Sequence, residues 1–178
     1  MVTVFTNELR NALNFVTGAV CKDKNRPLLQ QVHIKTQDSE HLIIEASNGY
    51  RLSREVVFIS EYTEHLDVIV PPFKVKAMLG NTSLELKNGW LEVASDNSDT
   101  IMLFRNSKGE YLKTDPILSG VGDPSFSIYL SSQALKSICN SFGNESLCFE
   151  FHGDMGAVII KESMGNKNKL ALLLPQRK

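Results

Sequence analysis

The sequence has few cysteines, no long apolar run and no excess of either charge, and each absence excludes a class of protein. Its three cysteines, Cys21, Cys139 and Cys148, form no CxxC pair, which argues against a disulfide framework and a zinc site. Glu8 and Arg10 interrupt the N-terminal segment early, so neither a signal peptide nor a membrane-spanning helix is predicted. We therefore expect a soluble protein of a reducing cytoplasm.

The charges almost cancel, with 19 basic and 20 acidic residues and a net charge of −1. The chain thus lacks the basic excess of a nonspecific nucleic-acid binder, and any DNA contact must come from charge gathered on one face. Its 178 residues, 42% of them hydrophobic, are enough to bury a substantial core.

Residues suited to catalysis or metal binding are also scarce. The histidines show no HExxH motif and no metal-ligand spacing, so we expect them at the surface. Carboxylates such as Asp67 and Glu92 are isolated in the pattern, and Cys139 and Cys148 suit small apolar positions better than nucleophiles. The sequence therefore predicts no catalytic residue, no metal and no cofactor. The four histidines are His33, His41, His65 and His152.

An internal repeat organises the chain. Residues 2–5 suit a strand, and the apolar residues that follow have helical spacing. Three further segments, 32–36, 41–47 and 52–59, are rich in β-branched or apolar residues and are bounded by turn formers. The apolar face of the predicted helix consists of Leu9, Ala12, Leu13, Val16, Ala19 and Val20.

The same order of elements recurs twice. A strand at 67–70 precedes a short predicted helix at 73–79, and the next strands flank the hairpin signal Asn88-Gly89. A third copy begins with a strand at 126–130, followed by a predicted helix and three strands ending near residue 174. Three βαβββ units at roughly 55-residue spacing predict an α+β fold, with the helices on one side of antiparallel sheets.

One group of basic residues stands out. The segment 22–26 follows the first predicted helix, and Lys74, Lys76 and Lys136 lie on or near the other two. These residues either make the helical layer positive or are ordinary solvated lysines, and spacing alone leaves both interpretations open.

Several segments resemble the beta subunit of bacterial DNA polymerase III, the sliding clamp. They are residues 26–32 (RPLLQQV), 44–52 (IEASNGYRL), 68–71 (VIVP), 109–111 (GEY) with 115–118 (DPIL), and 172–177 (LLLPQR). They occur in the order of the family. The resemblance implies a DNA clamp fold, in which residues 1–118 match the middle domain and residues 124–178 match the second half of the last domain, with a linker at 119–123.

The resemblance also implies a function. The family tethers polymerases to DNA by encircling the duplex, so it implies a non-enzymatic processivity factor in DNA replication. The alternative is an adaptor or decoy that binds the same partner peptides without encircling DNA. DNA contacts would be sequence-independent, through phosphates. The residues expected to make them are Arg10, Lys22, Lys24, Arg26, Lys74 and Lys136.

Clamps of this family hold short peptides of polymerases and clamp loaders between their middle and last domains. Gln176 and Lys178 replace apolar residues of the family here, which suggests a preference for more polar or acidic partners. The positions that match the peptide pocket are Leu29, Ser47, Gly49, Tyr50, Arg51, Leu52, Ile117, Leu172, Leu174, Pro175, Gln176 and Arg177.

The unpaired third unit predicts self-association. Its apolar helix and strands would expose a patch too large for a stable monomer. We expect a homodimer, in which the same unit of a second chain covers the patch, and possibly a tetramer. The residues of this patch are Leu135, Ile138, Phe142, Phe149 and Phe151.

Overall fold

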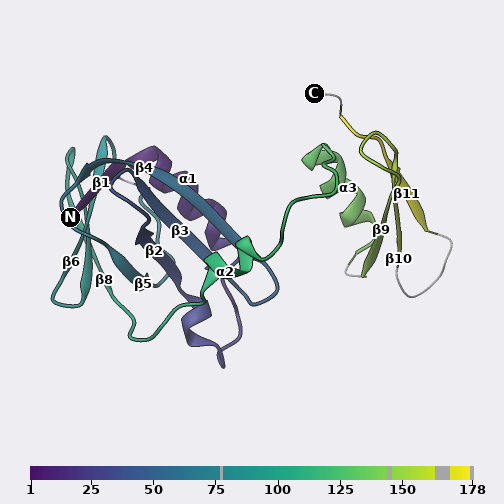
Figure 1. Ribbon diagram of the computed structural model, residues 1–178. Coiled ribbons are helices and arrows are strands. Elements are labelled where there is room, and N and C mark those ends of the chain that lie inside the picture. Colours follow the sequence, from purple (N-terminus) through teal and green to yellow (C-terminus); the bar gives the residue numbers. More distant parts are fainter. Residues whose placement is uncertain (77, 144–145, 163–168, 177–178) are drawn as a thin grey trace. The chain divides into compact units, whose positions relative to one another are not determined.

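The computed structural model describes residues 1–76, 78–143, 146–162 and 169–176. They form two compact units, Met1–Thr114 and Asp115–Lys178, each described here by itself (Figure 1). The elements of the first unit are β1 (Val2–Phe5), α1 (Thr6–Thr17), a 3-10 helix η1 (Pro27–Gln30), β2 (Val32–Thr36), β3 (His41–Ser47), β4 (Leu52–Tyr62), β5 (Asp67–Val70), β6 (Asn81–Lys87), β7 (Trp90–Ser95) and β8 (Ser98–Arg105).

The strands of the first unit form one antiparallel eight-stranded sheet in the order β5-β2-β3-β4-β1-β6-β7-β8. Two repeats build it, and each lends its first strand to the other: β1 pairs with β6, and β5 pairs with β2. The expectation of an α+β fold with antiparallel sheets is confirmed.

The two edges of this sheet are joined just past β8. The Ser107 N–H donates to the Ile69 carbonyl at 2.7 Å, and the Ile69 N–H donates to Asn106 Oδ1 at 2.8 Å. These bonds connect β5 to the chain that follows the last strand, so the backbone groups of an edge strand find partners instead of solvent.

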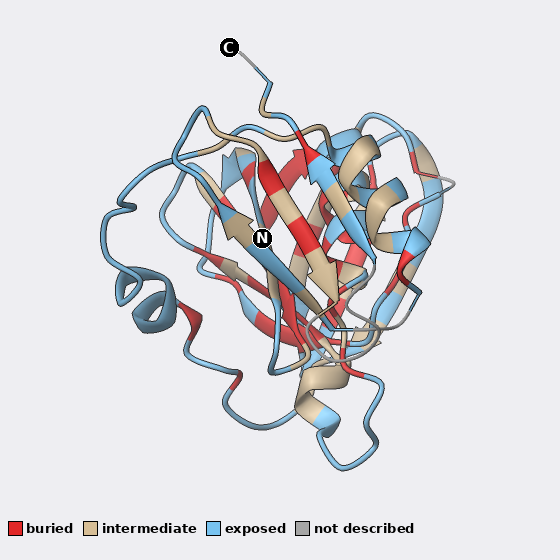
Figure 2. Ribbon diagram, turned by 90° about the vertical axis from the view of Figure 1, so that its right-hand side faces the viewer, coloured by how far each residue is buried: buried red, intermediate tan, exposed pale blue. Residues whose placement is uncertain are grey.

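Helix α1 places its apolar face on strands β3 and β4 (Figure 1). Leu9, Ala12, Leu13 and Val16 are buried, as their spacing predicts. Buried and less buried residues alternate along β6 and β7, whereas β3 is buried almost throughout. Figure 2 shows the buried residues in red. One core therefore fills the first unit between this helix and the sheet.

The helix predicted at 73–79 is not present in residues 73–76 or 78–79. Phe73 and Val75 are buried while Lys74 and Lys76 are exposed. This alternation has a period of two, which suits an extended chain better than a helix. The prediction was wrong because seven residues after a proline pair are too few for the helical pattern to outweigh the alternating one.

Arg10 of α1 holds this extended segment. Its Nη2 donates to the carbonyl oxygens of Met78 at 2.7 Å and Val75 at 3.2 Å, and its Nη1 donates to Asn7 Oδ1 at 2.6 Å. A guanidinium therefore satisfies two carbonyls of this non-helical segment.

Arg10→Ala is expected to lower the free energy of unfolding by roughly 2 kcal/mol, because charged hydrogen bonds to buried carbonyls are lost. Urea unfolding followed by the fluorescence of Trp90, the single tryptophan of the chain, measures the change. Lys22→Ala, at an exposed loop position, serves as the control. Equal stability of the two variants would contradict this role for Arg10.

The second unit contains α2 (Thr114–Ser119), which begins at the last residue of the first unit, and α3 (Ser132–Ser141). Strands β9 (Leu147–Phe151), β10 (Val158–Glu162) and β11 (Leu170–Leu173) form an antiparallel sheet in the order β11-β10-β9. Its small core consists of Phe142, Val158 and Ile160, with partly buried side chains around them.

The strand predicted at 126–130 is not formed. In the first unit the corresponding strands gain their ladders by crossing to a second repeat. The second unit contains one repeat, so the strand that residues 126–130 would pair with is missing from it. The prediction was wrong for residues 126–130, because a strand needs a neighbouring strand as well as a suitable sequence.

Candidate functional site

The turn between β3 and β4 carries five of the residues matched to the peptide pocket. Ser47 Oγ accepts from the Gly49 N–H at 3.1 Å and donates to the Arg51 carbonyl at 2.9 Å. Asn48 Oδ1 accepts from the N–H groups of Tyr50 and Arg51, both at 3.0 Å. Gly49 has φ of +88°, which favours glycine. The side chains thus hold a tight turn that leaves Tyr50 91% exposed.

Arg26, predicted to contact DNA, lies against this turn. A Cβ atom added to Gly49 would lie 2.7 Å from Arg26 Nη1, so the guanidinium occupies the space beside the glycine. Leu29 of η1 is partly buried close in sequence to Arg26. The structure therefore places Arg26 beside the turn that carries Tyr50. The sequence predicts a DNA contact for Arg26 and a peptide pocket for Tyr50, so residues expected on two different surfaces meet at this turn.

The C-terminal residues matched to the pocket follow β11. Leu172 and Leu174 are 54% and 67% exposed, while Leu173 between them is buried. The Gln176 N–H donates to the Tyr129 carbonyl at 2.7 Å and holds the tail within its own unit. Pro175 is partly buried.

Ile117 lies on α2 and is 51% exposed. Arg177 lies outside the described residues. The turn belongs to the first unit, whereas Ile117 and the tail belong to the second. A pocket formed by both sets remains a prediction.

A buried polar network, which the sequence did not reveal, lies beneath the turn. Glu45 is fully buried, and its carboxylate accepts from Arg54 Nε at 2.8 Å and Thr114 Oγ1 at 2.8 Å. His33 Nδ1 lies 2.9 Å from Glu45 Oε1, and its Nε2 lies 2.8 Å from Asp67 Oδ1. The network ties four strands, β2, β3, β4 and β5, to Thr114, the residue at which the first unit ends.

His33 corrects the prediction that the histidines lie at the surface, since its exposure is only 7%. Asp67, described as isolated, is its hydrogen-bonding neighbour. His33 and Glu45 face each other across the β2–β3 ladder, which brings their side chains together. A charged residue in the middle of each apolar strand was the signal that could have identified the network.

Hydrogen bonding decides the ionisation of Glu45. Burial acts to raise the pKa of its carboxyl group, but the hydrogen bonds from His33, Thr114 and Arg54 outweigh it and hold the pKa below its usual value. Burial also raises the pKa of Tyr111 to about 12. The Tyr111 hydroxyl accepts from the Ser47 N–H at 3.1 Å, which links the buried network to the turn above it.

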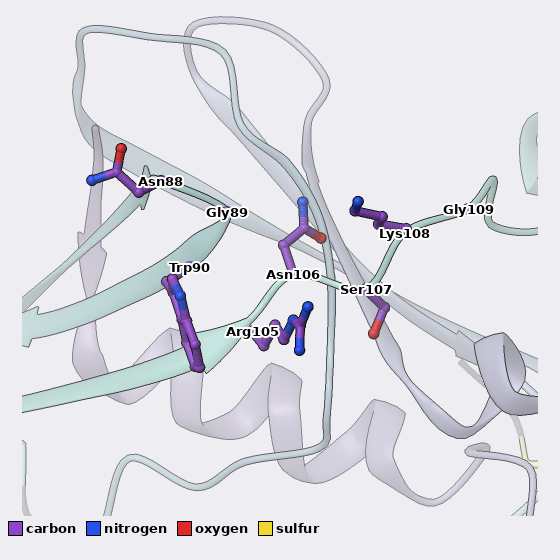
Figure 3. A pocket seen from close by; sticks show the side chains of 8 residues that line it. All are labelled: Asn88, Gly89, Trp90, Arg105, Asn106, Ser107, Lys108 and Gly109. Atoms are coloured by element: carbon purple, nitrogen blue, oxygen red, sulfur yellow. The ribbon is translucent and has the colours of Figure 1, made fainter.

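A cavity of about 760 Å³ lies at the end of the β6–β7 hairpin (Figure 3). Trp90 and Arg105 face each other across the β7–β8 ladder, and Lys108 lies on the following segment. An aromatic ring with two cations suits a planar or anionic group. The hairpin signal located the turn, but nothing in the sequence predicted the cavity. Its lining residues are Asn88, Gly89, Trp90, Arg105, Asn106, Ser107, Lys108 and Gly109.

The remaining residues expected to contact DNA are Lys22, Lys24, Lys74 and Lys136, all of which are exposed. Lys136 belongs to the second unit and the other three to the first. The exposed positions of α1 carry Glu8 and neutral residues, and Arg10 is bonded to backbone carbonyls. The solvent face of this helix is therefore not basic.

Two further observations bear on the chemistry. No helix within the described residues is long and apolar enough to cross a membrane. Among the same residues, no group of three or more His, Cys, Asp or Glu side chains is arranged to hold a metal ion.

The repeated strand exchange, the antiparallel sheets and the helix covering one face define a DNA clamp fold. Solved beta subunits of bacterial DNA polymerase III share it. The chain superposes on the Streptococcus pneumoniae beta chain with a TM-score of 0.73 at 17% identity, covering 98% of this chain and 49% of that one. For the Streptococcus pyogenes beta subunit the TM-score is 0.76 at 15% identity, covering 98% of this chain and 50% of that one. For the Bacillus subtilis sliding clamp the TM-score is 0.74 at 14% identity, covering 99% of this chain and 49% of that one.

The chain therefore spans about half the length of these clamps, and at such identities the similarity establishes the fold. No protein-family model and no curated protein matches the chain. The resemblance seen in the sequence motifs is confirmed at the level of the fold.

Proposed function

We propose that the chain is a non-enzymatic clamp-type protein of DNA replication that binds a short apolar peptide of a DNA polymerase or clamp loader. The clamp fold supports this proposal, because the similar structures are polymerase III beta subunits. The two sets of residues matched to the pocket would form its two walls.

The observation that carries the proposal is the exposure of apolar side chains at those matched positions. Tyr50, Leu172 and Leu174 are each more than half exposed. Leu172 and Leu174 lie two residues apart, and exposed apolar side chains that lie close together are typical of a binding surface. A peptide with apolar anchors would bury them.

The charges around these residues favour an acidic partner. Arg26 lies against the turn at Gly49, and Arg51 of the same turn is exposed. Gln176 is exposed where the family has an apolar residue. We therefore expect the bound peptide to carry acidic residues beside its apolar anchors.

Leu172→Ser is expected to weaken binding of a fluorescein-labelled clamp-binding peptide by about tenfold, the equivalent of one buried leucine contact. Leu170→Ser is the matched control, because Leu170 lies two residues earlier on the same face of β11 and is similarly exposed, at 59%. Fluorescence polarisation measures both affinities. Equal affinities of the two variants, or no binding by the unaltered chain, would contradict the peptide proposal.

DNA contact is a second proposed activity, and it is supported by the two exposed cations Lys22 and Lys24 in one loop. Such contacts would involve phosphates and depend on salt. Encircling the duplex would require an assembly of several chains. An assembly that binds the peptide but not DNA corresponds to the adaptor alternative.

Lys22→Glu/Lys24→Glu is expected to reduce the slope of log affinity for double-stranded DNA against log salt by about two units, since two phosphate contacts are removed. Lys87→Glu/Lys113→Glu changes the net charge equally and is the control. Electrophoretic mobility shifts at several salt concentrations measure the slope. Identical slopes for the two variants would exclude this loop as the DNA contact.

A further inference from the structure

Strand β9 is the last strand of the small sheet in the described part of the second unit. Within the described residues it pairs with β10 alone. Phe149 lies opposite Ile160 and Phe151 opposite Val158, so both rings share the face on which the buried Val158 and Ile160 lie. Even so, Phe149 is 36% and Phe151 47% exposed. The core face of this small sheet is therefore incomplete at β9.

The first unit shows what completes such an edge. There, the strand equivalent to β9 is β6 in one repeat and β2 in the other, because each is the first of three antiparallel strands. Each pairs with the leading strand of the opposite repeat, β1 or β5. The three strands of one repeat form a half-sheet, and its edge is thus covered by the four-residue leading strand of the other repeat.

The corresponding leading segment of the second unit is residues 127–130. The Gln176 N–H donates to the Tyr129 carbonyl at 2.7 Å, just as the Ser107 N–H donates to the Ile69 carbonyl at 2.7 Å. Each donor lies shortly after the third strand of its repeat. Tyr129 therefore occupies the position of Ile69, and residues 127–130 occupy that of β5.

This equivalence sets the register of a pairing. In the first unit Val70 lies opposite Val32, and Val68 lies opposite Ile34. Val70 corresponds to Leu130, and Val68 to Ile128. The positions of Val32 and Ile34 correspond to Leu147 and Phe149. This follows when the three repeats are aligned on the second strand of each hairpin, because the residues in question then lie opposite equivalent positions of that strand.

We propose that two copies of the chain associate about a two-fold axis, with residues 127–130 of each pairing antiparallel with β9 of the other. Ile128 then lies opposite Phe149 of the partner subunit, and Leu130 lies opposite Leu147 of the partner subunit. The two half-sheets form a complete clamp domain across the interface. This dimer forms whether or not the chain binds a polymerase peptide.

The chemistry of the two segments suits this pairing. Residues 127–130 are uncharged, so no charge is buried when they join the sheet. Both cross-strand pairs are apolar, and the exposed edge of β9 gains a ladder of backbone hydrogen bonds. A two-fold axis uses both edges at once and leaves none open for further chains.

A disulfide between the two copies tests the register. The N–H and C=O groups of Ile69 both bond toward residues 106–107, so Ile69 and His33 form a non-hydrogen-bonded pair, the type with the closest side chains. By the same geometry Tyr129 faces Cys148 of the partner subunit. Tyr129→Cys is therefore expected to give a covalent dimer under mild oxidation, visible on a non-reducing gel.

Two controls make the test specific to this register. Tyr129→Cys/Cys148→Ser is expected to give no covalent dimer, since Cys148 supplies the second sulfur. Ser127→Cys places the new thiol two residues away along the strand and is expected to cross-link several-fold more slowly. Equal rates for Ser127→Cys and Tyr129→Cys, or no cross-link with Tyr129→Cys, would overturn the proposed pairing.

The mass of the unaltered chain tests the association itself. Sedimentation equilibrium at micromolar concentration is expected to give twice the 19.9 kDa of one chain, or a multiple of that dimer. A monomer under these conditions would overturn the proposal and indicate that a different protein, if any, covers β9.

Discussion

Glu45→Gln is expected to lower the free energy of unfolding of the first unit by about 3 kcal/mol, because it breaks the buried ion pair between Glu45 and Arg54. Glu45 is fully buried and its carboxylate is bonded to His33, Arg54 and Thr114, so the substitution disturbs three hydrogen bonds at a buried position. This is a large share of the roughly 5–15 kcal/mol that stabilises most domains.

Urea unfolding measured through Trp90 reports on the first unit alone, because the single tryptophan lies there. Glu92→Gln provides the control, since Glu92 forms a partly exposed pair with Lys87, in which solvent screens the two charges. Equal losses of unfolding free energy from the two variants would show that the buried network stabilises the unit no more than a partly exposed ion pair does.

The same carboxylate predicts a dependence on pH. The pKa of Glu45 is lowered in the folded chain from its ordinary value of 4.5, so the folded state favours the ionised form. Its contribution to stability is fully present above pH 4.5, and it is lost as the pH falls through the lower pKa of the folded state. The unaltered chain is expected to lose stability in this acidic range more steeply than Glu45→Gln, and parallel curves would contradict this.

Local periodicity predicted the elements that repeat and pack within one repeat. Leu9, Leu13 and Val16 identified α1, and the Asn88-Gly89 pair identified the turn between β6 and β7. In these segments the local preference and the tertiary fold agree, so sequence spacing is enough. The strand order could be inferred only from the resemblance to the clamp family, because the exchange of leading strands between repeats leaves no local signal in the sequence.

The failures have a common physical cause, which is a partner distant in sequence. Residues 73–76 and 78–79 form no helix, and Arg10, more than sixty residues earlier, bonds the carbonyls of Val75 and Met78. His33 is buried because Glu45 and Asp67 flank it from two other strands. Spacing along the chain carries no information on either contact, so the network beneath the turn could be found only in the structure.

Deleting residues 174–178 is expected to weaken binding of the labelled clamp-binding peptide by roughly 100-fold, because Leu174 and the polar end of the matched tail are removed together. Leu174 is 67% exposed and follows the last strand, so its loss takes nothing from the core of the second unit. Undiminished binding after the deletion would refute the assignment of the tail to a peptide site.

The deletion also removes the Gln176 N–H that donates to the Tyr129 carbonyl, and this bond positions residues 127–130. Gln176→Pro separates the two effects, since proline lacks the N–H but the rest of the tail is kept. It is expected to weaken the dimer as much as the deletion does and to weaken peptide binding less, because Leu174 and Pro175 are kept. The deletion should weaken both, as sedimentation and polarisation on the same samples will show. If Gln176→Pro impairs the peptide as severely as the deletion does, the tail acts through the fold of its unit and not through contact with the peptide.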